Sequence, residues 1–434
     1  MIMETKHKDV LLEKFLEPSR WEYAIDVAID KKIDRAAIQK LASPEFRVQL
    51  YRSIRDGKYE IAPPYILQVP KPTPGEFRQV YCNWPVDRVV LSIINDMLFE
   101  LCPEMIHRSC RSYQKGMSCG DTVKQVASYM KKSSLSVPGY KTDLSKYFDK
   151  VPLRYIDETF DRVESKLGHS AIIDILRKYY HSGLYFDKEN VLHDKFDEYE
   201  HGQSLKQGCA VASFLADAIL YDIDEMMTER CDIYLRYSDD MMFFDKNPED
   251  ALNALKDALA KKDILINDKK TEALRHDRWF RFLGFSIKDD SISIPKDRLK
   301  TFQKEIESRT IRRKKTTLSR AVHSVNSYLY RGNGEYAWAD QILTVCNVDE
   351  DLREMDKFVL DCLRAVVTGK KKVGGLGFVS DGKKGCVARG IGRNVTANRI
   401  KTEAVIEGYL SLITMRNARR TCRTAYDSLV RSLQ

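Results

Sequence analysis

Apolar and charged positions alternate at two different spacings along this chain of 434 residues. Helical spacing, with an apolar residue every three or four positions, covers these stretches: 9–56, 85–102, 121–132, 154–180, the region after Gln207, 248–259, and most of the chain beyond Pro295. Strand-like or extended patterns lie between them, at 59–81, 139–143, 184–200, 233–245, 264–267 and 282–294. Strands and helices that alternate around antiparallel hairpins predict an α+β fold.

The stretch from Ile233 to Asp245 is the most informative of these patterns. Apolar residues run up to the tetrad Tyr237-Ser238-Asp239-Asp240 and resume directly after it, which predicts two buried strands joined by a polar tip. Two adjacent carboxylates raise each other's pKa unless a cation neutralises them, so the tip is a candidate metal site. The alternative is an ordinary turn, because aspartate is a common turn residue.

A second acidic element follows the predicted strand at 139–143. Asp143 stands where this strand ends and a helix begins, and Phe148 lies five residues further on. We expect Asp143 to lie near the acidic hairpin, with Phe148 close enough to cover a sugar bound there. A buried core position is the alternative for Phe148.

Three further positions carry candidate phosphate or nucleotide chemistry. Lys71 and Arg78 lie on either side of a predicted tight turn, where two cations would contact successive phosphates. A solvated loop is the alternative. Gln207-Gly208 precedes an apolar helix, and glycine there would let the backbone approach a flat ligand, although an ordinary helix start has the same pattern.

Composition adds a modest positive charge. The chain has 72 basic and 63 acidic residues, and basic residues concentrate at 309–315 and 369–401, which suits contact with a phosphate backbone. Its ten cysteines show no zinc-site spacing, which indicates reduced thiols. No window has the apolar length of a membrane span, and the N-terminal residues lack an apolar signal region, so we expect a cytoplasmic protein without a membrane partner.

Together these elements resemble a reverse transcriptase over roughly residues 10 to 330. The tetrad at 237–240 is similar to the Tyr-x-Asp-Asp hairpin of that family, Asp143 to Asp149 to its first metal motif, and Gln207-Gly208 to its Pro-Gln-Gly motif. The other similar elements are the lysine motif Lys270-Thr271, the primer grip Phe282-Leu283-Gly284-Phe285, and the bacterial fingers pattern at Val69-Pro70-Lys71, Arg78 and Asp87-Arg88.

The resemblance implies a right-hand polymerase with fingers, a palm built on an antiparallel sheet with helices, a thumb and a basic helical C-terminal extension. On this chain the implied parts are an N-terminal helical extension at 1–60, fingers at 61–139, a palm at 140–295 with a hairpin insertion at 182–201, a helical thumb at 296–368, and the basic extension at 369–434.

The resemblance also implies roles for individual residues. Two Mg²⁺ ions, for which Mn²⁺ would substitute, would be held by Asp143, Asp239, Asp240 and the backbone carbonyl of Leu144, while Lys270 would protonate the leaving group. The residues expected to bind the dNTP are Lys71, Arg78, Phe148 and Gln207. Those expected to bind template and primer are Gly208, Phe282, Leu283, Gly284, Arg312 and Arg313.

The implied activity is RNA-directed DNA synthesis from dNTPs on an RNA template. The chain looks most like the defence-associated bacterial enzymes, which implies a dedicated noncoding RNA as partner and a role against phage. Three alternatives stay open: a diversity-generating or intron-type reverse transcriptase, an untemplated or protein-primed DNA polymerase, and an RNA-binding scaffold without turnover. The sequence does not indicate the primer or the oligomeric state.

Five positions depart from the family pattern. Lys206 replaces the usual proline, Asp217 the expected asparagine, and Gln114 and Met117 two arginines, while Ser238 is an unusual residue within the tetrad. These changes leave the metal chemistry intact but alter the expected handling of the template.

Overall fold

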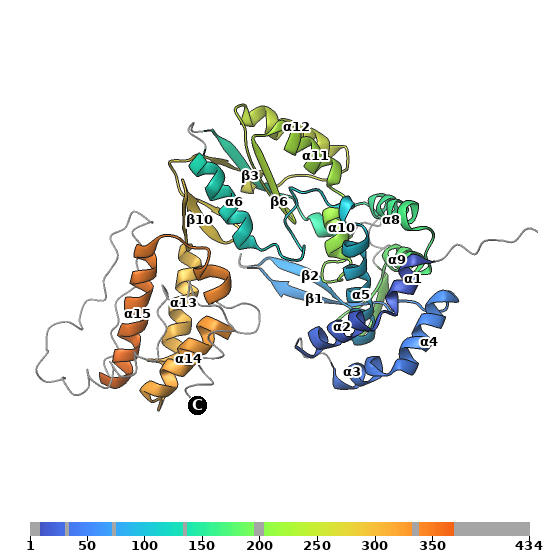
Figure 1. Cartoon of the computed structure of the whole chain (residues 1–434), viewed down its shortest axis with the longest axis horizontal. Coiled ribbons are helices and arrows are strands. Elements are labelled where there is room, and N and C mark those ends of the chain that lie inside the picture. Colours follow the sequence, from blue (N-terminus) through green and yellow to red (C-terminus); the bar gives the residue numbers. More distant parts are fainter. Residues whose placement is uncertain are drawn as a thin grey trace, which may run out of the picture. The chain divides into compact units, whose positions relative to one another are not determined.

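The structure, a computed structural model, describes residues 9–30, 34–71, 75–132, 137–194, 204–331 and 338–368. The chain divides into two compact units, one formed by Met1–Met117 with Pro138–Ala273 and the other by Ser118–Val137 with Leu274–Gln434. Figure 1 labels their helices and strands along the chain. The predicted basic extension at 369–434 lies outside the described residues.

The first unit begins with helices that pack around α5 (Figure 1). Their bounds are α1 Val10–Phe15, α2 Pro18–Asp30, α3 Arg35–Ala42, α4 Pro44–Arg55 and α5 Pro85–Leu101. Trp21 is fully buried here, and its indole N–H donates to the carbonyl of Phe15 at 2.7 Å. The predicted helical lead-in and the helix that starts at Pro85 are therefore confirmed.

A four-stranded sheet in the order β2-β1-β4-β5 follows from the extended stretches. Its bounds are β1 Tyr65–Pro70, β2 Phe77–Cys82, β4 Leu184–Phe186 and β5 Leu192–Asp194. The pairs β1–β2 and β4–β5 are antiparallel, and β1 pairs with β4 in parallel. The sheet confirms the predicted hairpin near residue 184, of which 195–201 lies outside the described residues.

A second four-stranded sheet, in the order β6-β7-β3-β8, carries both acidic elements. Its strands are β3 Gly139–Asp143, β6 Ile233–Tyr237, β7 Asp240–Phe244 and β8 Glu272–Leu274. The helices of this part of the chain are α7 Tyr147–Lys150, α8 Leu153–Leu167, α9 Ala171–His181, α10 Ala212–Ala218, α11 Tyr221–Arg230 and α12 Pro248–Ala260.

Three predicted elements in this region differ in detail. The helical pattern at 154–180 forms two helices, because Gly168 takes a φ of 85° and Ser170 caps α9. The apolar helix after Gln207 is likewise divided into α10 and α11. The strand expected at 264–267 is a single bridge between Leu144 and Ile266.

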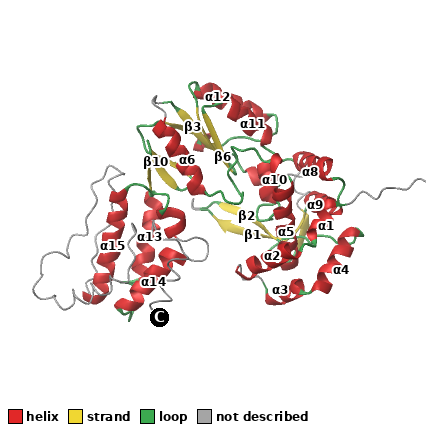
Figure 2. Cartoon of the chain, viewed as in Figure 1, coloured by secondary structure: helices red, strands yellow, loops and turns green. Residues whose placement is uncertain are grey.

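The second unit contains α6 Cys119–Lys132 and a three-stranded sheet in the order β11-β10-β9, with which α6 is in contact. The strands are β9 Phe280–Phe282, β10 Phe285–Lys288 and β11 Ser291–Ser293, followed by α13 Lys296–Arg309, α14 Leu318–Arg331, a π-helical turn Ala339–Leu343 and α15 Asp349–Thr368. Figure 2 shows α13, α14 and α15 as a helical group, as the sequence predicts beyond Pro295.

Aromatic packing stabilises this helical group. The rings of Phe302 and Trp338 lie 4.9 Å apart, and the Trp338 indole N–H donates to the Tyr328 hydroxyl at 3.0 Å. Mixed helices and mainly antiparallel sheets confirm the α+β class. The boundaries of fingers, palm and thumb stay predictions. No helix within the described residues is long and apolar enough to cross a membrane.

Candidate active site

The acidic tetrad forms a hairpin with a two-residue turn. Tyr237 at the end of β6 pairs with Asp240 at the start of β7, which leaves Ser238 and Asp239 at the bend. Ser238 adopts a left-handed φ of 58°. The strands themselves are largely buried, because their apolar residues face the core, so the polar tip is held by a rigid base. The predicted hairpin is confirmed.

The sheet brings the two acidic elements together. Asp143, the last residue of β3, pairs with Asp240 across the β3–β7 ladder. The next residue, Leu144, donates its backbone N–H to the carbonyl of Asp239 at 3.1 Å. Three carboxylates from two segments that are far apart in sequence are therefore fixed to one end of one sheet.

The electrostatics of this cluster are unfavourable without a cation. Burial and the charge of Asp143 raise the pKa of Asp239. Burial and the charges of Asp239 and Asp143 raise the pKa of Asp240 to about 6. Like charges held this close favour either protonation or a bound cation.

Lys270 supplies one positive charge to the cluster. It lies in the short 3₁₀ helix Asp268–Lys270, and its ammonium forms an ion pair with the Oδ2 atom of Asp143. This hydrogen bond raises the pKa of Lys270. A hydrogen bond of 2.8 Å between the hydroxyls of Thr142 and Thr271 joins β3 to the residue after Lys270.

The other oxygen of Asp143 indicates a ligand. Its Oδ1 atom is buried and has no hydrogen-bond partner among the described residues. An unsatisfied buried carboxylate oxygen is costly, and carboxylate oxygens are the ligands that Mg²⁺ prefers. The aspartates therefore fit the divalent cation that the sequence predicts.

The two candidate phosphate-binding cations differ in their surroundings. Arg78 is exposed on β2, and its charge offsets part of the burial-driven rise in the pKa of Asp239, which places it in electrostatic range of the site. Lys71 instead lies 3.6 Å from Glu76 within its own hairpin. The structure thus shows an electrostatic effect of Arg78, but not of Lys71, on the acidic cluster.

The Gln207-Gly208 segment lies against strand β2. The carbonyl of Gln207 accepts a hydrogen bond of 2.7 Å from the backbone N–H of Tyr81. Gly208 has a φ of 106°, and a Cβ atom there would lie 2.7 Å from the carbonyl of Tyr81. The backbone of Tyr81 therefore occupies the space that a side chain at position 208 would need. This explains the glycine, and no flat ligand has to be assumed.

Lys206 explains how this chain manages without the usual proline. The residue is buried, and its ammonium donates to the carbonyls of Tyr179 and Ser182, at 2.5 and 2.8 Å, where α9 ends. It also lies 4.1 Å from the centre of the Tyr179 ring. A lysine that binds helix-terminal carbonyls ties the segment before α10 to the end of α9, in place of the rigid proline ring.

Phe148 lies in α7 next to the first metal motif. It is half-buried, and its ring meets that of Tyr147 edge-on at 5.8 Å. Its carbonyl accepts a hydrogen bond from the N–H of Leu205 at 2.8 Å, which joins α7 to the segment before Gln207. Its role as a sugar gate stays a prediction.

The predicted template and primer residues of the second unit lie on two elements. Phe282 is buried in β9, and the residues after it form the turn into β10, where Leu283 and Gly284 take φ values of 47° and 77°. Arg312 forms an ion pair with Glu307, whereas Arg313 lines a cavity of about 460 Å³.

Comparison of the sequence with known protein families identifies the family of this chain. The model described as reverse transcriptase (RNA-dependent DNA polymerase) matches residues 69–287, which is just over half of the chain. The chain belongs to this family. No curated protein matches the chain at a significant level.

Solved structures similar to this reverse transcriptase chain include yeast telomerases. Apo telomerase from Candida tropicalis is 15% identical with a TM-score of 0.43, covering 83% of this chain and 63% of the telomerase. Its form truncated from the C-terminal domain is 16% identical with a TM-score of 0.39, covering 54% and 56%. Telomerase from Candida albicans with a telomeric RNA fragment is 9% identical with a TM-score of 0.42, covering 73% and 63%. The chain thus spans less than two thirds of each.

Sequence reasoning missed a group of buried side chains in this reverse transcriptase chain, two of which, Ser112 and Arg236, bind the backbone of the acidic turn. Ser112, Asp217 and Arg236 are fully buried. The sequence marks Asp217 only as a departure from the family pattern, and in the structure burial raises its pKa to about 6. The available signal was Arg236, because an arginine within an otherwise apolar strand requires a buried acidic partner.

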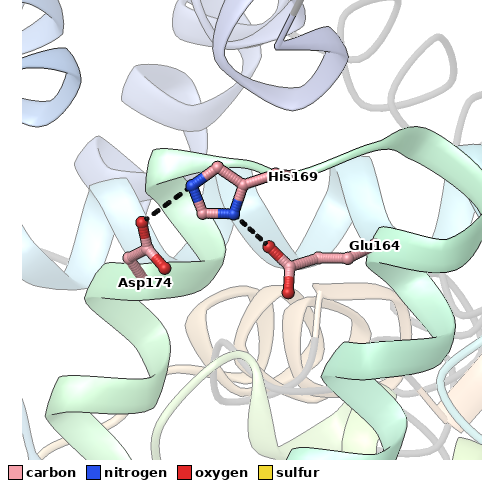
Figure 3. Close-up of side chains that lie close together, drawn as sticks. All are labelled: Glu164, His169 and Asp174. Atoms are coloured by element: carbon pink, nitrogen blue, oxygen red, sulfur yellow. Dashed lines mark hydrogen bonds and ion pairs between the residues drawn. The ribbon is translucent and has the colours of Figure 1, made fainter. Parts of the chain in front are cut away.

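A second acidic cluster lies elsewhere on the first unit. Figure 3 shows His169 between Glu164 and Asp174, whose ligand atoms all lie within 4.8 Å of one another. The Nδ1 atom of His169 lies 2.9 Å from Glu164, and Arg177 contacts the other oxygen of Glu164 at 3.1 Å. We interpret the group as a polar network that joins α8 to α9, because both oxygens of Glu164 already have partners in His169 and Arg177.

Proposed function

We propose that this chain is an RNA-directed DNA polymerase that synthesises DNA from dNTPs on an RNA template. One observation carries the proposal. The sheet holds Asp143 opposite Asp240, with Asp239 at the adjoining turn, in a chain of the reverse transcriptase family. Carboxylates from two motifs, held together at one end of a sheet, suit two-metal nucleotidyl transfer.

The cation is proposed to be Mg²⁺, with Mn²⁺ as a substitute. Asp143 and Asp239 would hold two ions, supported by Asp240 and by the carbonyl of Leu144. Such ions activate a primer hydroxyl and neutralise the charge on the triphosphate and the leaving pyrophosphate. The protein's contribution is the fixed geometry of the carboxylates, which is set by the ladder between β3 and β7.

Two cationic side chains complete the proposed chemistry. Lys270 is protonated at neutral pH, and its hydrogen bond and ion pair with Asp143 raise its pKa further. It therefore has a proton to donate to the leaving group once another cation neutralises Asp143. Arg78 is exposed beside the cluster and would offset charge on the incoming triphosphate, with Lys71 and Gln207 as further dNTP contacts.

We assign sugar selection to Phe148. Its backbone carbonyl accepts the N–H of Leu205, which holds the backbone of α7, and its ring is half-buried five residues after Asp143. An aromatic ring at that place would exclude a 2′-hydroxyl, which makes deoxynucleotides the expected substrate.

Nucleic acid is proposed to contact the second unit through its cationic surface. The cavity near the end of α13 is lined by arginine, histidine and serine side chains, among them Arg309, Arg313 and Arg320, and Arg309 also forms an ion pair with Glu305 at 3.3 Å. Arginine side chains gathered in this way favour phosphate oxygens. Arg312 and the turn Phe282–Gly284, with Gly208 in the first unit, complete the proposed template and primer contacts.

The proposal also includes a cellular location, an RNA partner and a biological role. The eight cysteines among the described residues are all free thiols, as a reducing cytoplasm requires. We include a dedicated noncoding RNA as the template and a role in antiphage defence, both of which rest on the resemblance of the sequence. The other reverse transcriptase classes and an untemplated or protein-primed polymerase are the competing assignments within the same chemistry.

One experiment separates the polymerase from a silent RNA-binding scaffold. The protein is immunoprecipitated from cells, and the RNA and DNA bound to it are sequenced, for the wild type and for an Asp239→Ala, Asp240→Ala double variant. We expect one dominant RNA in both samples and complementary DNA only with the wild type. Equal RNA and no DNA in either sample would support the scaffold instead.

A further inference from the structure

Strand β6 contains a fully buried arginine two residues before the catalytic turn. The Nε and Nη2 atoms of Arg236 donate to the two carboxylate oxygens of Asp224, at 2.7 and 2.6 Å. Its remaining N–H groups donate to the carbonyls of Ala216, Asp217 and Ser238, at 3.3, 2.9 and 3.1 Å. All five donors of the guanidinium therefore have acceptors, which fixes its position.

One of these acceptors belongs to the turn itself. The carbonyl of Ser238 precedes Asp239 directly, and Arg236 binds it from inside the protein. The other backbone group of Ser238 is also bound, because its N–H donates to the hydroxyl of Ser112 at 2.9 Å. Both polar atoms of the peptide backbone at this residue are thus held by buried side chains.

The hydroxyl of Ser112 has a defined orientation. It donates to the Oδ1 atom of Asp217 at 2.6 Å, so its lone pairs remain to accept the N–H of Ser238. Asp217 in turn lies 3.6 Å from Arg236. Ser112, Asp217 and Arg236 form one connected polar group beneath the turn.

This polar group stabilises Ser238, whose backbone conformation is energetically unfavourable. Ser238 takes a left-handed φ of 58°, which is unfavourable by roughly 1 to 2 kcal/mol for residues other than glycine. Hydrogen bonds to both of its backbone groups offset that cost and select this conformation. The direction of the Asp239 side chain follows, because Asp239 is the next residue and its own carbonyl is bound by Leu144.

We propose that Ser112 and Arg236, connected through Asp217, are positioning residues that hold the Asp239 carboxylate in the direction needed to bind a divalent cation. The inference rests on the proposed function for its catalytic meaning. It also accounts for one departure from the family pattern, because Asp217 orients the Ser112 hydroxyl.

Variants of Ser112 test this without removing a buried charge. Ser112→Ala loses the acceptor for the Ser238 N–H, whereas Ser112→Thr keeps a hydroxyl. Ser170→Ala is the matched control, because Ser170 is an equally buried serine whose hydroxyl accepts the N–H of Ile172 at the start of α9. The control loses one hydrogen bond at a place that does not touch the turn.

The first readout is hydrogen–deuterium exchange of the Ser238 amide in the full-length, metal-free protein. Loss of one hydrogen bond should speed exchange roughly fivefold in Ser112→Ala. Ser112→Thr should restore the wild-type rate, and Ser170→Ala should leave it unchanged. The second readout is Mn²⁺ binding by titration calorimetry, which should weaken roughly tenfold in Ser112→Ala alone.

Activity completes the test. Ser112→Ala should lower kcat while the KM for dNTP stays within about twofold, because the dNTP contacts are untouched. Wild-type exchange and Mn²⁺ binding in Ser112→Ala would overturn the inference, as would equal changes in Ser170→Ala. If the wild type makes no DNA, the proposed function fails, while the exchange and Mn²⁺ comparisons still decide whether the group positions Asp239.

Discussion

Asp240→Asn should stabilise the metal-free protein at neutral pH. The pKa of Asp240 rises from an ordinary 3.8 to about 6 through burial and the charges of Asp239 and Asp143. At about 1.36 kcal/mol per unit, this shift corresponds to about 3 kcal/mol. Neighbouring groups desolvate the Asp240 carboxylate, but the residue itself keeps an exposed surface at the start of β7, so solvent screening reduces the expected gain to about 1 kcal/mol.

The sign follows from proton linkage. A carboxyl whose pKa is higher in the folded than in the unfolded protein destabilises the fold above the higher value, and it contributes nothing below the lower one. The gain from Asp240→Asn should therefore be complete at pH 7.5, fall to about half at pH 5, and vanish below about pH 4.

Urea unfolding in chelator-treated buffer measures this difference. Asp257→Asn is the control, since it removes one exposed acid from α12, away from the cluster. In 10 mM Mg²⁺ the wild type should gain stability and Asp240→Asn should gain less. If Asp240→Asn is no more stable than the wild type at pH 7.5 without metal, the argument that these carboxylates repel one another is wrong.

Three further changes test other parts of the structure. Asp217→Asn should flatten the pH dependence of stability, because burial raises the pKa of Asp217 to about 6. Between pH 4 and 7 the wild type should lose about 2 to 3 kcal/mol of unfolding free energy relative to the variant. If urea unfolding gives the two proteins the same change with pH, this reasoning is contradicted. Gly208→Ala should lower the unfolding free energy by roughly 3 kcal/mol, because its Cβ would meet the Tyr81 carbonyl at 2.7 Å; an unchanged unfolding midpoint would argue against that close approach. Phe148→Ala should raise incorporation of ribonucleotides relative to deoxynucleotides by at least roughly tenfold in single-nucleotide extension, and an unchanged ratio would remove Phe148 from sugar selection.

Local patterns were sufficient to predict the elements that carry the site. The acidic hairpin, the strand that ends at Asp143 and the helices beyond Pro295 all follow from the spacing of apolar residues, because that spacing reflects which face is buried. Breaks within long helical patterns were less visible. The pattern is apolar on both sides of Leu220, and only the backbone there shows that one helix ends and another begins.

Contacts between distant residues could not be read from the sequence. Ser112 binds Asp217 and Ser238, which lie more than a hundred residues away along the chain. Nothing near Ser112 signals these partners, since a lone serine is common in loops. Lys206 is similar: its departure from the proline pattern was visible, but the carbonyls at the end of α9 that explain it come from another element.

DNA synthesis by the purified full-length chain tests the central claim most directly. The reaction contains an RNA template with an annealed primer, the four dNTPs and Mg²⁺, and the product is sequenced for the wild type and for Asp239→Ala. The account predicts DNA complementary to the template with the wild type and none with the variant. It would be contradicted if folded wild type made no DNA, if the product did not match the template, or if Asp239→Ala synthesised DNA at the wild-type rate.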